Sequence, residues 1–141
     1  MKKSLLVACA LVAGFQALPA GAGCTLETLK GTMAWSTTSF SVTGSVSSGS
    51  GQESYDGRGN MKYFELYSDG LISTSYAGTG TYTLSESCIA VVTYDSETVP
   101  WVYFVSADGD HYYWNNNQGN GVINSGRADR VSTELLVKLL K

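Results

Sequence analysis

The chain has 141 residues, of which 43% are hydrophobic and 15% are charged, and its net charge is −3. This length suits one domain, and the low charge together with 16 aromatic residues excludes a disordered chain. The 16 glycines come with only 2 prolines, which excludes a collagen-like repeat. The composition is typical of a globular β protein rich in glycine and tyrosine.

Residues 1–22 have the pattern of a bacterial signal peptide. Two lysines precede an apolar run over residues 5–12, and small residues end the segment at Ala20 and Ala22. The apolar run is shorter than the about 20 residues of a membrane span, so no transmembrane anchor is expected. We therefore predict cleavage before Gly23 and export to the periplasm or the extracellular space.

The charge that remains after this cleavage is acidic. Loss of the two lysines leaves 7 basic and 12 acidic side chains, a net charge of −5. Binding to nucleic acid needs a basic surface for the phosphates, and binding to an anionic membrane surface needs one too. The sequence therefore argues against both partners.

Two cysteines remain in the predicted mature chain, Cys24 and Cys88. In an oxidising compartment they most simply pair with each other, and closing a loop of this length stabilises a fold by about 4 kcal/mol. Neither cysteine has a second cysteine or a histidine at the spacing of a metal site. We predict a structural disulfide and expect neither a metal nor a cofactor.

Strand patterns follow one another along the predicted mature chain. Alternating apolar and polar residues lie between turn signals from Thr32 onward, whereas the serine- and glycine-rich residues 47–51 indicate a loop. Leucines at helical spacing in residues 132–141 favour a short C-terminal helix. The predicted strands lie around Met33 and Trp35 and at 40–46, 60–67, 71–76, 79–84, 88–94, 101–105, 110–114 and 122–131.

Eight or nine short strands with no helix between them predict an antiparallel meander. Closure removes exposed strand edges, so we predict an all-β, up-and-down barrel of about eight strands over residues 23–131, with a tail at 132–141. A two-sheet β-sandwich is the alternative.

Several short motifs occur in a set order: the turn Asp-Gly-Arg-Gly-Asn at 56–60, the strand start Gly-Thr-Gly-Thr-Tyr-Thr at 78–83, and then Cys88. This order resembles a group of small secreted bacterial proteins of the calycin or allene-oxide-cyclase type, which form lipocalin-like barrels. The resemblance implies that fold, with either ligand binding or a cyclase activity. Calycins also pair an early tryptophan with a basic residue on the closing strand. The resemblance thus implies a cation–π contact between Trp35 and Arg130 at one barrel end.

The predicted strand at 60–67 carries a carboxylate among phenols. Alternation places Tyr63, Glu65 and Tyr67 on one face of the strand and Lys62, Phe64 and Leu66 on the other. If the tyrosine face lines the lumen, Glu65 is a buried acid with a raised pKa and is a candidate for proton transfer. If the Phe64 face points inward, Glu65 is solvated. The sequence leaves both orientations open.

Four aromatic residues on two adjacent predicted strands are the candidate ligand-binding residues. Trp101 and Tyr103 share one strand face, and Tyr112 and Trp114 share a face of the next strand. Such rings suit an apolar or aromatic ligand in a concave site. A packed core with ordinary surface tyrosines explains the same residues.

The sequence therefore favours binding of a small apolar or aromatic ligand over catalysis. The first alternative is a cyclase or isomerase that uses Glu65 with Tyr63 and Tyr67 and gains rate by holding a flexible substrate in a reactive conformation. The second is an envelope or extracellular module that binds a protein through an exposed strand edge or the leucine-rich tail.

Overall fold

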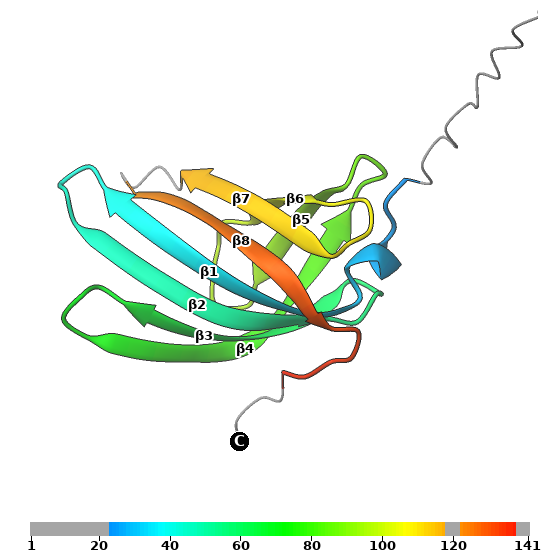
Figure 1. Cartoon of the computed structure of the whole chain (residues 1–141), viewed down its shortest axis with the longest axis horizontal. Coiled ribbons are helices and arrows are strands. Elements are labelled where there is room, and N and C mark those ends of the chain that lie inside the picture. The colour runs from blue at the N-terminus through cyan, green and yellow to red at the C-terminus, as the bar shows by residue number, and fades with distance from the viewer. Residues whose placement is uncertain (1–22, 118–121, 138–141) are drawn as a thin grey trace, which may run out of the picture.

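The computed structural model describes residues 23–117 and 122–137, in which eight antiparallel strands form one closed barrel. Each strand pairs with the next along the chain, and the last pairs with the first (Figure 1). This confirms the predicted up-and-down barrel and excludes the sandwich. The predicted signal peptide, 1–22, lies outside the described residues. The strands are β1 (Gly31–Ser41), β2 (Val46–Tyr55), β3 (Asn60–Ser68), β4 (Ser73–Leu84), β5 (Ile89–Tyr94), β6 (Trp101–Val105), β7 (His111–Asn117) and β8 (Val122–Ser132).

Two predicted strand assignments are wrong. The chain turns between β1 and β2 at residues 42–45, so 40–46 is not one strand and the predicted loop at 47–51 lies inside β2. The predicted strands at 71–76 and 79–84 merge into the single strand β4, which begins at Ser73.

Glycines opposite large rings explain the loop wrongly predicted at 47–51 and the break wrongly predicted within β4. Gly51 pairs with Trp35 and Gly78 pairs with Tyr63 in the sheet register. A Cβ atom at Gly51 would lie 2.8 Å from the Trp35 ring, and one at Gly78 would lie 2.8 Å from the Tyr63 ring. These glycines therefore make room for inward-facing aromatic side chains within continuous strands and do not mark turns.

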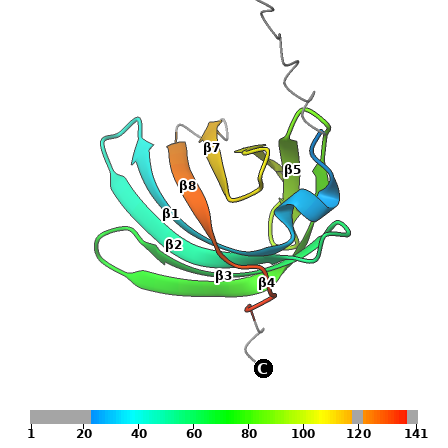
Figure 2. The same ribbon diagram turned by 45° about the vertical axis from the view of Figure 1, so that its right-hand side comes forward.

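One end of the barrel is closed by a short 3-10 helix, η1 (Leu26–Leu29), which the sequence analysis did not predict. Its last residue, Leu29, is fully buried, and the predicted disulfide between Cys24 and Cys88 ties this segment to the end of the barrel. Figures 1 and 2 show η1 at the end opposite the tips of the β1–β2 and β3–β4 hairpins. The barrel thus has a closed end and an open end.

Arg130 on β8 holds the end of η1 against the barrel through hydrogen bonds. Its guanidinium donates hydrogen bonds to the carbonyls of Lys30, Thr28 (2.7 Å) and Gly109 (2.6 Å), and it pairs with Asp110 at 3.1 Å. Gly109 has φ +72°, and a Cβ there would lie 1.9 Å from the Thr28 carbonyl oxygen, so this close approach requires glycine. Arg130 is therefore occupied by backbone carbonyls at the closed end.

The predicted C-terminal helix is wrong for the described part of the tail. Residues 133–137 leave β8 without helical structure, and 138–141 lie outside the described residues. The Thr32 hydroxyl donates to the Glu134 carbonyl (2.6 Å) and accepts from the Leu136 N–H (2.9 Å), while the Val137 N–H donates to the Ser54 hydroxyl (3.0 Å). These side chains satisfy tail backbone groups that a helix would otherwise pair. Across residues 23–117 and 122–137, no helix is long and apolar enough to span a bilayer.

Candidate ligand-binding cavity

A buried carboxylate on β2 organises the middle of the barrel. Glu53 is 1% exposed. One of its oxygens accepts hydrogen bonds from the hydroxyls of Tyr55 and Tyr112, and the other accepts one from Tyr94. The Tyr94 and Tyr103 hydroxyl oxygens lie 2.6 Å apart. Glu53 thus joins four strands, β2, β5, β6 and β7, through phenols that are far apart in the sequence.

The aromatic rings of these tyrosines also pack against one another. Tyr103 and Tyr112 stack with centroids 4.5 Å apart, and Tyr55 meets Tyr82 edge to face at 5.0 Å. Such ring pairs add stability beyond the burial of their area. The result is a rigid layer that forms the floor of a cavity on the open side of the barrel.

Burial determines the protonation chemistry of the floor. Burial raises the pKa values of Tyr55, Tyr94, Tyr103 and Tyr112 well above that of a free phenol, so their hydroxyls remain hydrogen-bond donors at neutral pH. Burial also raises the pKa of Glu53, and the hydrogen bonds from the tyrosines oppose that rise. The floor is therefore built from neutral phenols around a carboxyl group whose pKa burial raises.

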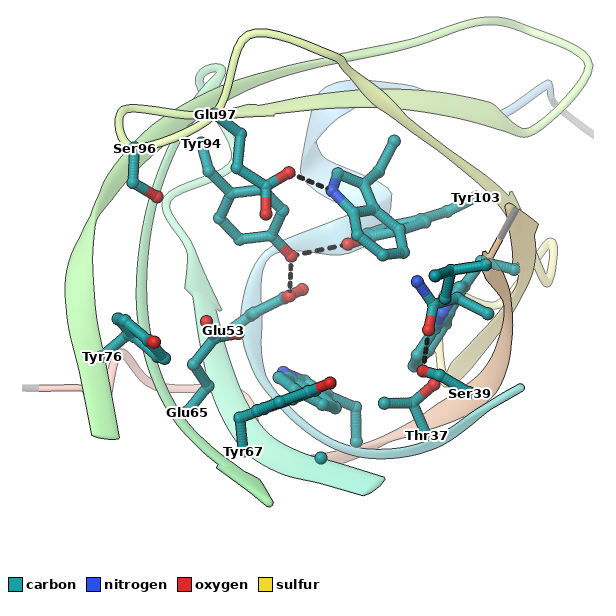
Figure 3. Close-up of a pocket in the computed structure, with 16 residues that line it drawn as sticks. Thr37, Ser39, Glu53, Glu65, Tyr67, Tyr76, Tyr94, Ser96, Glu97 and Tyr103 are labelled. Atoms are coloured by element: carbon teal, nitrogen blue, oxygen red, sulfur yellow. Dashed lines mark hydrogen bonds between the residues drawn. The ribbon is translucent and has the colours of Figure 1, made fainter. Parts of the chain in front are cut away.

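Above the floor lies a cavity of about 480 Å³ that Glu53, Tyr94 and Tyr103 line from below (Figure 3). All three tryptophans of the chain line it, and two of them, Trp35 and Trp114, meet edge to face with centroids 6.1 Å apart. A small barrel usually fills its interior with side chains. Here the filling stops at the tyrosine layer, and the upper lumen is open.

Glycine also shapes the wall at Trp114. Gly126 on β8 lies directly across from Trp114, and a Cβ at Gly126 would lie 2.2 Å from that indole ring. The indole N–H groups of Trp35 and Trp114 are buried and have no hydrogen-bond acceptor in the described part of the chain. The cavity wall therefore contains two indole N–H donors that make no hydrogen bond within the described residues.

The structure places the tyrosine face of β3 inward. Glu65 and Tyr67 line the cavity, while Tyr63 is buried lower in the barrel and its hydroxyl bonds Ser96 at 2.9 Å. Glu65 is half-buried and has no hydrogen-bond or ion-pair partner among the described residues. Burial and the nearby carboxylates of Glu53 and Glu97 raise the pKa of Glu65 to about 7. Glu65 is thus an unpaired acid within an aromatic cavity.

This shift predicts a pH-dependent contribution to stability. The folded protein binds the Glu65 proton more tightly than the unfolded chain does, so Glu65 loses its stabilising contribution as the pH rises from about 4.5 to about 7. We expect Glu65→Gln to remove this loss and to be at least as stable as the natural protein at about pH 8. Guanidinium unfolding across this pH range measures the difference. Glu86→Gln, an exposed position near the closed end of the barrel, is the control. If the free energy of unfolding changes with pH in the same way for Glu65→Gln and the natural protein, the prediction is contradicted.

The predicted site residues fall into three groups. Trp101, Tyr103 and Trp114 line the cavity, whereas Tyr112 is fully buried in the floor beneath it. Trp35 also lines the cavity, against Trp114, while Arg130 binds carbonyls at the closed end. The structure therefore does not bring Trp35 and Arg130 together in the predicted contact. Among the described residues, a cation–π contact is made instead by Arg127, whose guanidinium carbon lies 5.3 Å from the centroid of the Tyr113 ring.

The sequence analysis missed two acids of the site. Glu53 follows the serine- and glycine-rich residues that were assigned to a loop, although alternation with Gly49, Gly51 and Tyr55 places it on one strand face. Glu97 lies between β5 and β6 and accepts a hydrogen bond from the Trp101 indole N–H. No local pattern marks Glu97, because its role depends on where the barrel places the Trp101 ring.

No protein-family model and no curated protein sequence matches the chain. The solved structures that are similar to it include two redesigned β-barrels and a phycobiliprotein lyase. The redesigned β-barrel mFAP0 bound to DFHBI has 20% identity and a TM-score of 0.45, over 73% of this chain and 99% of that one. The redesigned β-barrel b11L5F_LGL has 21% identity and a TM-score of 0.45, over 75% and 94%. The S-type phycobiliprotein lyase CPES from Guillardia theta has 11% identity and a TM-score of 0.44, over 74% and 89%. Identities and TM-scores this low imply nothing about a ligand or an activity of this chain.

Proposed function

We propose that the barrel binds a small ligand with an apolar or aromatic body in its upper lumen. The observation that carries the proposal is the cavity of about 480 Å³ above the Glu53 floor, into which Trp35, Trp101 and Trp114 all face. A volume of this size suits a small organic molecule, and aromatic walls with a few polar groups are the usual lining of such sites. The closed end and the rigid floor leave the opposite end as the entrance.

The test uses two neighbouring threonines on β1. Thr37 lines the cavity, whereas Thr38 is exposed on the outer face. We expect the neutral dye N-phenyl-1-naphthylamine to bind with enhanced emission, Thr37→Phe to weaken that binding at least about tenfold, and Thr38→Phe to leave it within about twofold. Equal binding by the two variants would place the dye outside the lumen. No binding to the natural protein would contradict the proposed function.

A second candidate function is proton transfer during a cyclisation or isomerisation. The supporting observation is Glu65, whose pKa of about 7 suits an acid or base at neutral pH and which shares the cavity with Tyr67. The floor carboxylate Glu53 is less suited to this role, because phenol hydroxyls already occupy both of its oxygens. Any proton transfer in this cavity is therefore assigned to Glu65.

We also propose that the protein is exported. The disulfide between Cys24 and Cys88 is compatible with an oxidising compartment, and residues 1–22 have the signal-peptide pattern.

A protein partner remains the third hypothesis. Ile89, Phe104 and Tyr113 lie in register across β5, β6 and β7 and are 38–55% exposed, which gives the outer surface an apolar row.

A further inference from the structure

We propose that the ligand of this cavity carries a positively charged amine, held beside Glu65 and among the aromatic rings of the wall. This inference rests on the proposed function and specifies the chemical class of the ligand. It concerns an organic cation with an apolar or aromatic body, such as an arylalkylammonium ion.

The first support is the sign of the charge in the cavity. Glu53, Glu65 and Glu97 line it, and the lining contains no lysine, arginine or histidine among the described residues. Figure 3 shows the Glu65 side chain pointing into the same space as Glu53 and Tyr76. Above about pH 7, where Glu65 is ionised, a partly enclosed space with this lining attracts a cation and repels an anion.

The three carboxylates are not equivalent, and this difference locates the ammonium group. The phenols of the floor satisfy Glu53, and the Trp101 indole donates to Glu97. Glu65 alone of the three has no hydrogen-bond or ion-pair partner in the described part of the chain. A bound ammonium would supply that partner and offset the cost of burying the Glu65 charge.

Aromatic rings complete the complementarity to an organic cation. Tyr76 lies directly across from Glu65 in the β3–β4 register, and Tyr67 is the next inward residue along β3. Ring faces attract ammonium groups most strongly where water is excluded. The described residues contain no group of three or more His, Cys, Asp or Glu side chains able to hold a metal ion. The lining therefore favours an organic cation over a metal ion.

The test compares two ligands with the same skeleton, 2-phenylethylammonium and 2-phenylethanol, by displacement of N-phenyl-1-naphthylamine and by tryptophan emission. At about pH 8 we expect the ammonium to bind at least about tenfold more tightly than the alcohol. In Glu65→Gln the two ligands should bind within about threefold of each other. Glu86→Gln, at the exposed closed end, should keep the natural preference.

A pH series on the natural protein gives a second readout that needs no substitution. Between about pH 8 and about pH 5.5 the amine stays protonated while Glu65 gains its proton, so the affinity for the ammonium should fall and that for the alcohol should stay level. The titratable groups that face Glu65 lie on five elements, namely Glu53 on β2, Tyr63 and Tyr67 on β3, Tyr76 on β4, Glu97 before β6 and Tyr103 on β6. Burial raises the pKa values of Tyr63 and Tyr103, so these two phenols keep their protons throughout this range.

The outcomes separate this inference from the proposed function. Equal affinity for the two ligands in the natural protein, or a preference that survives in Glu65→Gln, would overturn the amine assignment and leave lumenal binding intact. If the dye, the alcohol and the ammonium all fail to bind, the proposed function fails and the inference fails with it.

Discussion

Glu53→Leu is expected to lower the free energy of unfolding by about 3–5 kcal/mol. The substitution removes the acceptor of three buried hydroxyls, of which that of Tyr94 also has the Tyr103 hydroxyl within hydrogen-bonding distance. Each buried hydroxyl left without a partner costs about 1–3 kcal/mol. Guanidinium unfolding monitored by circular dichroism measures the loss.

Two variants serve as controls for the Glu53 prediction. Gln52→Leu changes the neighbouring, exposed residue and should alter stability by less than about 0.5 kcal/mol. Tyr112→Phe should be destabilising alone but nearly neutral in the Glu53→Leu background, because the acceptor of its hydroxyl is already gone. A loss of less than about 1 kcal/mol in Glu53→Leu, or additive effects of the two substitutions, would contradict the role of Glu53 as the centre of the floor.

Removal of the disulfide has the second large expected effect. Replacing Cys24 and Cys88 together by alanine should cost about 4 kcal/mol, because the bridge closes a loop between residues 64 apart. The bridge also holds the segment that leads into η1, where the Cys24 N–H donates to the Glu86 carbonyl at 3.2 Å. We therefore expect the closed end to open before the rest of the barrel.

Unfolding of the double variant and hydrogen exchange of its amides test this account. Exchange should rise first around Leu29, the fully buried last residue of η1 in the natural protein. The natural protein in reductant should match the double variant. Equal stability with and without the bridge would show that the Arg130 contacts hold the closed end unaided.

The fold could be predicted because alternation and turn residues are local signals. Asp108 and Gly109 mark the hairpin between β6 and β7, and the β-branched residues of β5 mark a strand regardless of their partners. The same local rules misassigned the glycines of β2 and β4, because a glycine that accommodates an opposing ring looks like a turn residue when the opposing strand is unknown.

The site was less accessible to prediction because it depends on contacts between distant residues. Alternation separates the two faces of β3 but cannot say which one faces the lumen, so the inward position of Glu65 required the closed barrel. Glu53 gains its role from Tyr94 and Tyr112, which lie 41 and 59 residues away. The aromatic residues were identified from the sequence alone, yet whether they enclose a filled or an open lumen depends on packing.

The central claim, that a small molecule occupies the upper lumen, is tested most directly by the indole N–H signals in a ¹⁵N–¹H correlation spectrum. The chain has three tryptophans and all three line the cavity, so every such signal reports on it. On titration with 2-phenylethanol we predict that all three signals shift and saturate with one dissociation constant, while the amides of the outer row at Ile89, Phe104 and Tyr113 stay in place. Shifts confined to that outer row, with the indole signals unmoved, would contradict a lumenal site.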